Sequence, residues 1–190
     1  MVCLSEIKKM EVLSSDGRAI GHVDDITIDD KWSIKGFTIK LDKEVARSMG
    51  KQTPLLSALK LDVGLDIIKS IGDKVLLNQP VSELGAHMKT QEGVRRVSSF
   101  MGMKVVSTEG KILGKVDDIA FEPYTWKMPS LHITVPRDVL DALKAKKPIL
   151  GKGTLSLSMV HVKSIKDYVM LDTDYEGLSR ILETSTVKAH

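Results

Sequence analysis

The segment that decides the fold is residues 10–26, which read MEVLSSDGRAIGHVDDI. Residues 103–119 read MKVVSTEGKILGKVDDI and repeat this segment 93 positions later. After one inserted residue the offset is 94, which aligns Trp32 with Trp126 and holds as far as Val169. Because nearly one offset holds over this length, the chain contains two copies of one domain and not a series of short repeats.

Each copy has the pattern of short strands separated by tight turns. Asp16-Gly17 and Glu109-Gly110 stand between apolar-alternating segments, which is the strongest short-range pattern of a β-hairpin. In the strand after each turn, the apolar phase shifts at Asp24-Asp25 and again at Asp117-Asp118. Side chains alternate between the two faces of a strand, so such a shift needs an extra residue. We therefore expect a β-bulge at both aspartate pairs.

Further alternating segments predict three more strands in each copy, at residues 37–41, 61–65 and 74–77 and at residues 131–135, 155–159 and 168–171. Short helices are expected at residues 45–49 and 139–143, ahead of Pro54 and Pro148, because proline is excluded from a helix interior. Short strands at close spacing favour a small closed barrel, which leaves no exposed sheet edge. The predicted fold is mainly β, with two small barrels in tandem, short helices and a pseudo-twofold relation between the copies.

The expected domains are residues 1–88 and residues 97–190, with residues 89–96 as a linker. Each domain ends in a short amphipathic segment. The apolar positions of these segments are Val81, Leu84 and Met88 in the first domain and Leu178, Ile181 and Leu182 in the second. Helices this short are unstable alone in water, so each must dock, either on its own barrel or on a partner.

The composition is that of a folded, soluble protein, with 42% apolar residues, 28 Lys and Arg, and 25 Asp and Glu in 190 residues. A net charge of +3 does not by itself indicate a nucleic-acid-binding protein, and 4% aromatic residues argue against a base-stacking platform. A single cysteine, Cys3, excludes an internal disulfide framework and a cysteine-rich zinc site. The N-terminus has no secretory signal pattern, and no apolar run approaches about 18 residues, so we expect a cytoplasmic protein.

The sequence offers few groups for catalysis. Paired carboxylates at Asp24-Asp25 and Asp117-Asp118 are able to hold a cation or exchange protons, but adjacent strand residues point to opposite faces. A structural role in the bulge is therefore favoured. The five histidines lack the spacing of zinc ligands, and Gly151-Lys152-Gly153-Thr154 precedes a strand, whereas a phosphate loop opens a helix. We expect no enzyme activity, no catalytic residue, no metal and no cofactor.

Three sets of residues are candidates for binding a partner. A basic cluster is suited to RNA phosphate, an acidic protein or an anionic membrane, but it is equally suited to the end of a helix dipole. Two matched tryptophans fit either packing at the barrel edge or an interface, where tryptophan is enriched. The candidates are Lys144, Lys146 and Lys147, then Trp32 and Trp126, and then Leu178, Ile181 and Leu182.

The order of glycine turn, bulge and closing strand resembles the PRC-barrel family. Both copies carry Val-x-Ser-x-(Asp/Glu)-Gly-(Lys/Arg)-x-(Ile/Leu)-Gly-x-Val-x-Asp-Ile and later Lys-Ser-Ile-x-Asp-x-Val-x-Leu. The resemblance covers about residues 4–77 and 97–171. The family includes the cytoplasmic domain of the photosynthetic reaction-centre H subunit, the C-terminal domain of the ribosome maturation factor RimM, and stand-alone archaeal proteins, the type that this duplicated chain is most similar to.

The resemblance implies a six-stranded barrel, a tendency to form dimers, and work as an adaptor without catalysis. Archaeal members act in cell division and link to SepF and so to the FtsZ ring. We therefore expect a protein–protein interaction adaptor in archaeal cell division, with a SepF-like partner, a homodimer, and recruitment from the cytoplasm to the division site. The alternative is a ribosome- or RNA-processing-associated factor that resembles RimM, which the low net charge makes less favoured.

Overall fold

The chain folds into two compact units. The computed structural model describes residues 1–50, 58–87, 93–145 and 153–187. Unit 1 comprises Met1–Ser99 and Phe121–Met128, and unit 2 comprises Phe100–Ala120 and Pro129–His190. Residues 121–128 belong to the second repeat by sequence, so the tip of a hairpin from that repeat is part of unit 1. The predicted domain bounds stay a prediction, and Met88 and residues 89–92 of the predicted linker lie outside the described residues.

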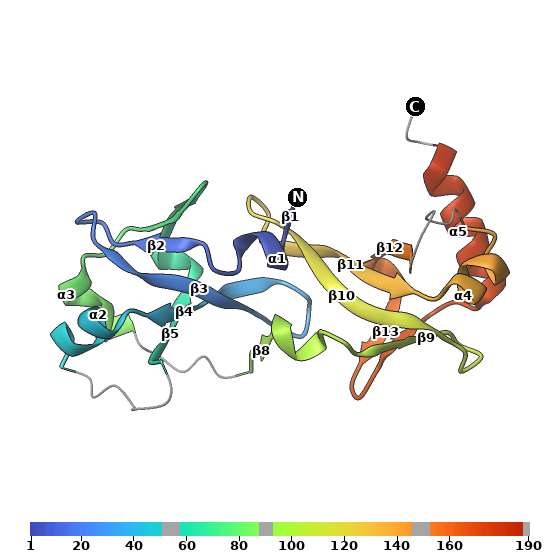
Figure 1. The fold of residues 1–190 in the computed structure, drawn as a ribbon, viewed down its shortest axis with the longest axis horizontal. Coiled ribbons are helices and arrows are strands. Elements are labelled where there is room, and N and C mark those ends of the chain that lie inside the picture. The colour runs from blue at the N-terminus through green and yellow to red at the C-terminus, as the bar shows by residue number, and fades with distance from the viewer. Residues whose placement is uncertain (51–57, 88–92, 146–152, 188–190) are drawn as a thin grey trace. The chain divides into compact units, whose positions relative to one another are not determined.

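Unit 1 is built on one β-sheet. Its main strands are β2 (Glu11–Leu13), β3 (Ala19–Ile28), β4 (Ile34–Leu41), β5 (Lys60–Gly64), β6 (Ile68–Ile71) and β7 (Val75–Leu77). The shorter elements are β1 (Val2–Cys3), α1 (Leu4–Ile7), α2 (Lys43–Ser48), α3 (Val81–Leu84), β8 (Arg95–Arg96), and 3₁₀ turns at Leu65–Ile67, Gly85–His87 and Val97–Phe100. Neighbouring strands follow the order β5-β4-β3-β2-β7-β6 (Figure 1). The first and last strands of the repeat, β2 and β7, are parallel neighbours, with Val12 opposite Val75.

Unit 2 repeats this arrangement. Its strands are β9 (Lys104–Val106), β10 (Ile112–Glu122), β11 (Lys127–Val135), β12 (Gly153–Ser158), β13 (Val162–Ile165) and β14 (Val169–Leu171). Its helices are α4 (Arg137–Ala142) and α5 (Tyr175–Val187), with a 3₁₀ turn at Met159–His161. The strand order is β12-β11-β10-β9-β14-β13, and β9 and β14 are parallel, with Val105 opposite Val169. The predicted mainly β fold with two matching domains and short helices is confirmed, whereas the pseudo-twofold relation stays a prediction.

Within the described residues the two sheets are open, which corrects the predicted closure. In unit 1 the end strands β5 and β6 are joined through the 3₁₀ turn Leu65–Ile67. This turn redirects the chain, so β6 pairs with β7 and not with β5. The turn Met159–His161 does the same between β12 and β13 in unit 2. Alternation of apolar residues reports which face of a strand is buried, but it does not report which strands exchange hydrogen bonds.

The predicted bulge is present in β3. The register between β3 and β4 passes from Val23 to Asp25, so Asp24 is the extra residue. The Asp25 side chain accepts the N–H of the next residue, Ile26, at 2.9 Å. Asp118 makes the equivalent bond to its own neighbour at 2.8 Å, which repeats this local geometry in unit 2.

A second irregularity in β3, which the sequence analysis did not predict, lies opposite β2. The register between these strands skips Ile20, which is fully buried, and the next residue is Gly21. A Cβ on Gly21 would lie 2.1 Å from a carbonyl oxygen of β4. The register of β10 likewise skips Leu113, and a Cβ on Gly114 would lie 2.2 Å from a carbonyl oxygen of β11. Both repeats therefore keep glycine because two backbones approach too closely for a side chain.

Each unit encloses its own apolar core, whose burial from water is the main favourable contribution to folding. Fully buried members in unit 1 are Val12, Ile20, Phe37, Ile39, Leu61, Val63 and Val75. The core of unit 2 includes Val105, Leu113, Leu131, Ile133, Val135, Val169 and Leu171. In unit 1 these residues come from β2, β3, β4, β5 and β7, and in unit 2 from β9, β10, β11 and β14, so strands far apart in the sequence share one core.

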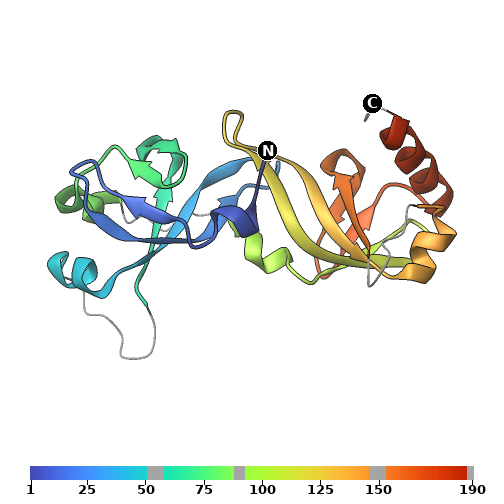
Figure 2. The same cartoon turned by 45° about the horizontal axis from the view of Figure 1, so that its top comes forward.

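The second amphipathic segment docks within unit 2. Helix α5 lies beside α4 in both views (Figures 1 and 2), and the Ser179 hydroxyl donates to the Leu143 carbonyl oxygen at 2.9 Å. Leu178 is 2% exposed. At Leu178 the helix therefore packs on its own domain, one of the two alternatives that the sequence left open.

Candidate functional site

The paired carboxylates of β3 have separate partners. Asp25 is 3% exposed, and its Oδ1 accepts the backbone N–H groups of Ile26 at 2.9 Å and Ser98 at 3.0 Å. Its Oδ2 accepts the Ser98 hydroxyl. The neighbouring Asp24 forms an ion pair with Lys60, with the Nζ and Oδ2 atoms 2.6 Å apart. The two carboxylates therefore hold different parts of unit 1, as the structural interpretation of the bulge requires.

The basic pair at the start of the second repeat is also held internally. Arg95 and Arg96 form β8, which pairs with the end of β3. The Arg96 guanidinium lies 3.3 Å from Asp62, whose other oxygen accepts the Thr38 hydroxyl at 2.6 Å. This arginine therefore neutralises a carboxylate of unit 1, which leaves it less suited to an external anion.

The other candidate chemistry stays dispersed. Among the described side chains, no three His, Cys, Asp or Glu residues are grouped to hold a metal ion. His161 lies 3.6 Å from Asp172, and Cys3 is a partly exposed cysteine near the start of the chain that forms no disulfide within the described residues. Of the glycine-rich segment, Gly153 opens strand β12 and is buried, while residues 151–152 lie outside the described part.

The two matched tryptophans lie in equivalent turns, both within unit 1. Trp32 and Trp126 have φ angles of 62° and 55°, a left-handed conformation that is rare for bulky residues and costs about 1–2 kcal/mol each. The turns are joined by two backbone bonds. Ile34 N–H donates to the Trp126 carbonyl oxygen at 2.7 Å, and Met128 N–H donates to the Trp32 carbonyl oxygen at 3.2 Å. These bonds, on either side of a Ser33–Lys127 bridge, hold both strained turns in place.

Trp126 also lines a hollow on unit 1, which we call the aromatic hollow. Its indole ring meets the buried Phe37 ring edge-on, with centroids 6.2 Å apart. The hollow has a volume of about 630 Å³, and its lining includes Met1, Met10, Ile71, Pro123, Tyr124 and Trp126. Tyr124 is 97% exposed and Met1 is 80% exposed. Trp126 was a candidate from the sequence but Tyr124 was not, although Tyr124 lies only two residues before Trp126.

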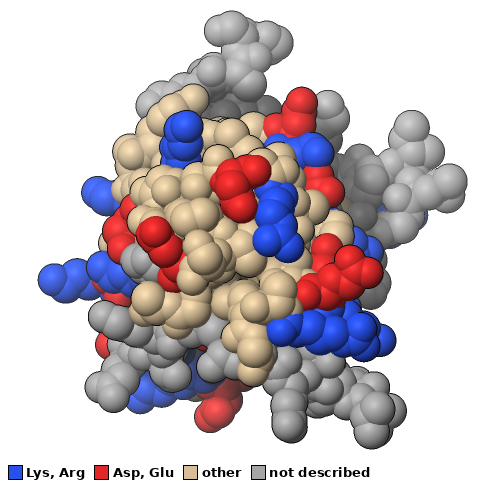
Figure 3. All heavy atoms as spheres, turned by 90° about the vertical axis from the view of Figure 1, so that its left-hand side faces the viewer, with Lys and Arg blue, Asp and Glu red and all other residues tan. Residues whose placement is uncertain are grey.

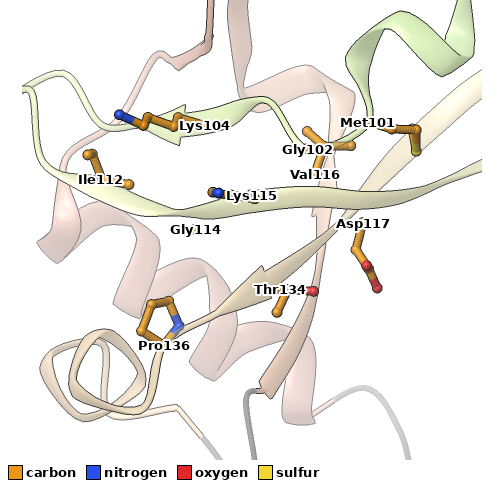
Figure 4. A pocket seen from close by; sticks show the side chains of 10 residues that line it. All are labelled: Met101, Gly102, Lys104, Ile112, Gly114, Lys115, Val116, Asp117, Thr134 and Pro136. Carbon is orange, nitrogen blue, oxygen red and sulfur yellow. The ribbon is translucent and has the colours of Figure 1, made fainter.

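A second concave surface, the unit 2 groove, crosses β9, β10 and β11 (Figure 4). It has a volume of about 650 Å³ and a mainly apolar lining that includes Met101, Ile112 and Pro136. Ile112 is 50% exposed, and its carbonyl oxygen accepts the Tyr175 hydroxyl of α5 at 3.0 Å. Burial raises the pKa of Tyr175, so its hydroxyl keeps its proton to a higher pH than that of an exposed tyrosine.

The remaining candidates from the sequence are scattered. Lys144 is exposed after α4, with a φ of 53° and its N–H donating to the Asp141 carbonyl oxygen. Lys146 and Lys147 lie outside the described residues. Ile181 is partly exposed on α5, and Leu182 belongs to the same helix. The structure does not bring the basic cluster, the tryptophans and the α5 residues together into one described site.

The described charges are mixed in sign. On the face of unit 1 that carries α2 and α3, Lys and Arg side chains are interleaved with Asp and Glu (Figure 3). In the part of the chain that the structure describes, no helix combines the length and the apolar character needed to cross a bilayer.

Comparison with known proteins agrees with the repeat and the paired sheets. The PRC-barrel domain family matches residues 1–84 and again residues 92–178, which together make up most of the chain. No curated protein matches the sequence. The duplicated motif, the parallel pairing of first and last strands in each repeat, and these two matches show that the chain belongs to the PRC-barrel family as a tandem of two domains.

Proposed function

We propose that the chain is a non-catalytic adaptor that binds other proteins through its two PRC-barrel domains. The observation that carries this proposal is the aromatic hollow, where Tyr124 is 97% exposed beside Trp126. Tyrosine and tryptophan combine a large apolar area with a polar group, and they dominate the binding energy of many protein interfaces. An exposed tyrosine at the rim of an apolar hollow is a surface suited to a protein partner.

The non-catalytic part of the proposal rests on how the carboxylates are used. Asp25 and Asp62 each accept hydrogen bonds from residues that hold strands or turns together. Asp24 is paired with Lys60. A general acid or base must reach a substrate proton, and these groups are engaged within the fold.

The process that we propose is cell division in an archaeon. A SepF-like protein is the proposed partner, and through it the chain would be recruited from the cytoplasm to the FtsZ ring, with a homodimer as the assembled form. This part rests on the resemblance of both repeats to archaeal members of the family. The alternative from the same family, a ribosome-associated factor like RimM, is a result that the experiment below distinguishes.

The test is capture of partners by the tagged full chain from its native lysate, with quantitative identification of every recovered protein. We expect division-ring components, and we expect their recovery to fall in Tyr124→Ala. Val160→Ala is the control, because Val160 is an exposed apolar residue of unit 2 that lines neither the aromatic hollow nor the unit 2 groove. Recovery of ribosomal proteins in their place would favour the RimM-like role. Turnover of a substrate, or recovery that ignores Tyr124, would overturn the proposal.

A further inference from the structure

The duplication places the same groove on both units, and the two grooves differ in chemistry. The unit 1 groove, of about 530 Å³, is lined by Lys8, Lys9, His22, Val23, Asp24, Lys40, Leu41 and Asp42. By the offset of the repeat, these positions correspond to residues that line or adjoin the unit 2 groove. Lys8 is replaced by Met101, Lys40 by Thr134, and Asp42 by Pro136. Three charged residues of the unit 1 groove are therefore replaced by uncharged ones, and the charged residues that line the unit 2 groove are Lys104, Lys115 and Asp117.

The clearest difference is one cross-strand pair at the groove edge. In unit 1 Glu11 faces His22 across β2 and β3, and Glu11 forms an ion pair with Lys74. The hydrogen bond and charge of Lys74 lower the pKa of Glu11, so this carboxylate has its counterion within the domain. At the equivalent place in unit 2, Lys104 faces Lys115 across β9 and β10.

Asp117 also lines the unit 2 groove, but among the described residues it forms no ion pair with either lysine. Neither Lys104 nor Lys115 forms an ion pair there, and the position of Lys74 is taken by Tyr168. Like charges directly opposite one another destabilise a β-sheet. A carboxylate from another molecule would supply the charge that Glu11 supplies in the first repeat.

Ile112 places an apolar contact beside these cations. Its counterpart in unit 1 is Ala19, so the second repeat exposes a larger side chain at the same position. Figure 4 shows Ile112 next to Lys104 and Lys115, with Pro136 across the groove. A phosphate backbone would meet the lysines but would gain little from this apolar lining. An apolar side chain flanked by carboxylates would contact both parts.

We infer that the unit 2 groove binds an acidic protein segment with an apolar anchor residue, whose carboxylates pair with Lys104 and Lys115. We expect the unit 1 groove to bind such a segment less tightly, because Asp24 and Asp42 both line it and because Ala19 stands where unit 2 exposes Ile112. This inference rests on the proposed adaptor function and assigns one of its partner surfaces. Two matching domains would then have different binding preferences, which is a use for the duplication.

The test uses the ¹⁵N-labelled full chain and two pools of short peptides. One pool has a central Leu, Ile or Phe flanked by Glu, and the other has the same centres flanked by Gln. We expect the acidic pool to shift the amide signals of Lys104, Ile112 and Lys115, while those of His22 and Lys40 stay in place. The acidic pool should bind about three- to tenfold more tightly than the Gln pool, as expected for two exposed ion pairs.

Variants separate the charge from the apolar contact. Lys104→Glu restores the residue type of the first repeat, Ile112→Ala restores that of Ala19, and each should weaken binding by about three- to tenfold. Lys40→Ala, on the rim of the unit 1 groove, is the matched control and should bind as the unchanged chain does. All three positions are exposed at their side chains, so the variants are expected to fold.

Several results would overturn the groove assignment. These are equal binding of both pools, no binding of either, unchanged binding in Lys104→Glu and Ile112→Ala, or shifts that map to unit 1. Anionic vesicles or single-stranded RNA that occupy the groove and exclude the peptides would also overturn it. If partner capture by the full chain succeeds while the peptides fail, the adaptor function stands and only this surface is wrong. If capture yields no protein partner, the adaptor function itself fails.

Discussion

Replacement of Asp25 by Ala tests whether the bulge in β3 holds residues 95–98 in unit 1. The Asp25 carboxylate accepts two backbone N–H groups and one hydroxyl group while it is 3% exposed. Two of these three donors belong to Ser98. Hydrogen bonds to a charged group contribute about 1.5–3 kcal/mol, and a buried donor left without a partner costs about 1–3 kcal/mol. Because the Ser98 donors regain water if the segment detaches, we expect the free energy of unfolding to fall by about 3 kcal/mol.

Asp24→Ala is the matched control for this prediction. Asp24 is the adjacent carboxylate, but it is more exposed and it pairs with Lys60, whose side chain is also exposed. An exposed ion pair contributes about 0.2–1 kcal/mol, so this variant should lose no more than that. The losses in the free energy of unfolding that we expect for the two variants are therefore far enough apart for equilibrium unfolding to distinguish them.

Urea unfolding followed by circular dichroism measures the free energies, and hydrogen exchange reports the Ser98 amide directly. We expect Asp25→Ala to lose protection at Ser98, while Asp24→Ala retains it. Ser98→Ala, which removes the hydroxyl but keeps the backbone bond, should fall between the two. Equal destabilisation by Asp25→Ala and Asp24→Ala, or full protection of Ser98 in Asp25→Ala, would refute the reasoning.

Three further predictions concern the fold. Gly114→Ala should destabilise unit 2 by about 1–3 kcal/mol, because its Cβ would lie 2.2 Å from a carbonyl oxygen. Gly72 has open space around it, so Gly72→Ala should be close to neutral in the same urea titration. Because the pKa of Glu11 is lowered in the folded state, its ionised carboxylate stabilises the fold above the ordinary carboxyl pKa, and this stabilisation is lost as the pH falls through the folded-state pKa. Lys74→Met should therefore raise the pKa of Glu11 toward its usual value, as measured by an NMR titration. Leu178→Ala should lower the free energy of unfolding by about 2–5 kcal/mol and release α5. The release would be measured as a loss of helical circular dichroism at temperatures below the main unfolding transition. An unchanged melting curve would show that Leu178 does not hold α5.

Local features of the fold were predictable from the sequence because their causes are local. Gly17 has a φ of 77°, and its N–H donates to the Ser14 carbonyl oxygen, as the hairpin pattern at Asp16-Gly17 requires. The bulge at Asp24 followed from the shift in apolar phase. The repeat of these features 93 residues later identified two domains of one family.

Features that depend on distant residues were not predictable. Arg95-Arg96 read as part of a polar linker, yet it forms a strand against the end of β3 and an ion pair with Asp62. The two tryptophans were predicted to be equivalent, but nothing in their spacing indicated that Ser33 and Lys127 would bridge their turns. Tyr124 and Ile112 were missed because a single exposed apolar residue gives no periodic pattern.

The amino-acid sequence by itself determined the duplication, the short strands, the glycine turns and the bulge, because periodicity and backbone sterics act between near neighbours in the chain. The tertiary structure alone decided that the sheets stay open, that residues 121–128 join unit 1, and that Lys104 faces Lys115 beside an exposed isoleucine. These outcomes come from packing and hydrogen-bond pairing between segments far apart in sequence, where many pairings satisfy the same local pattern and the whole core selects one of them.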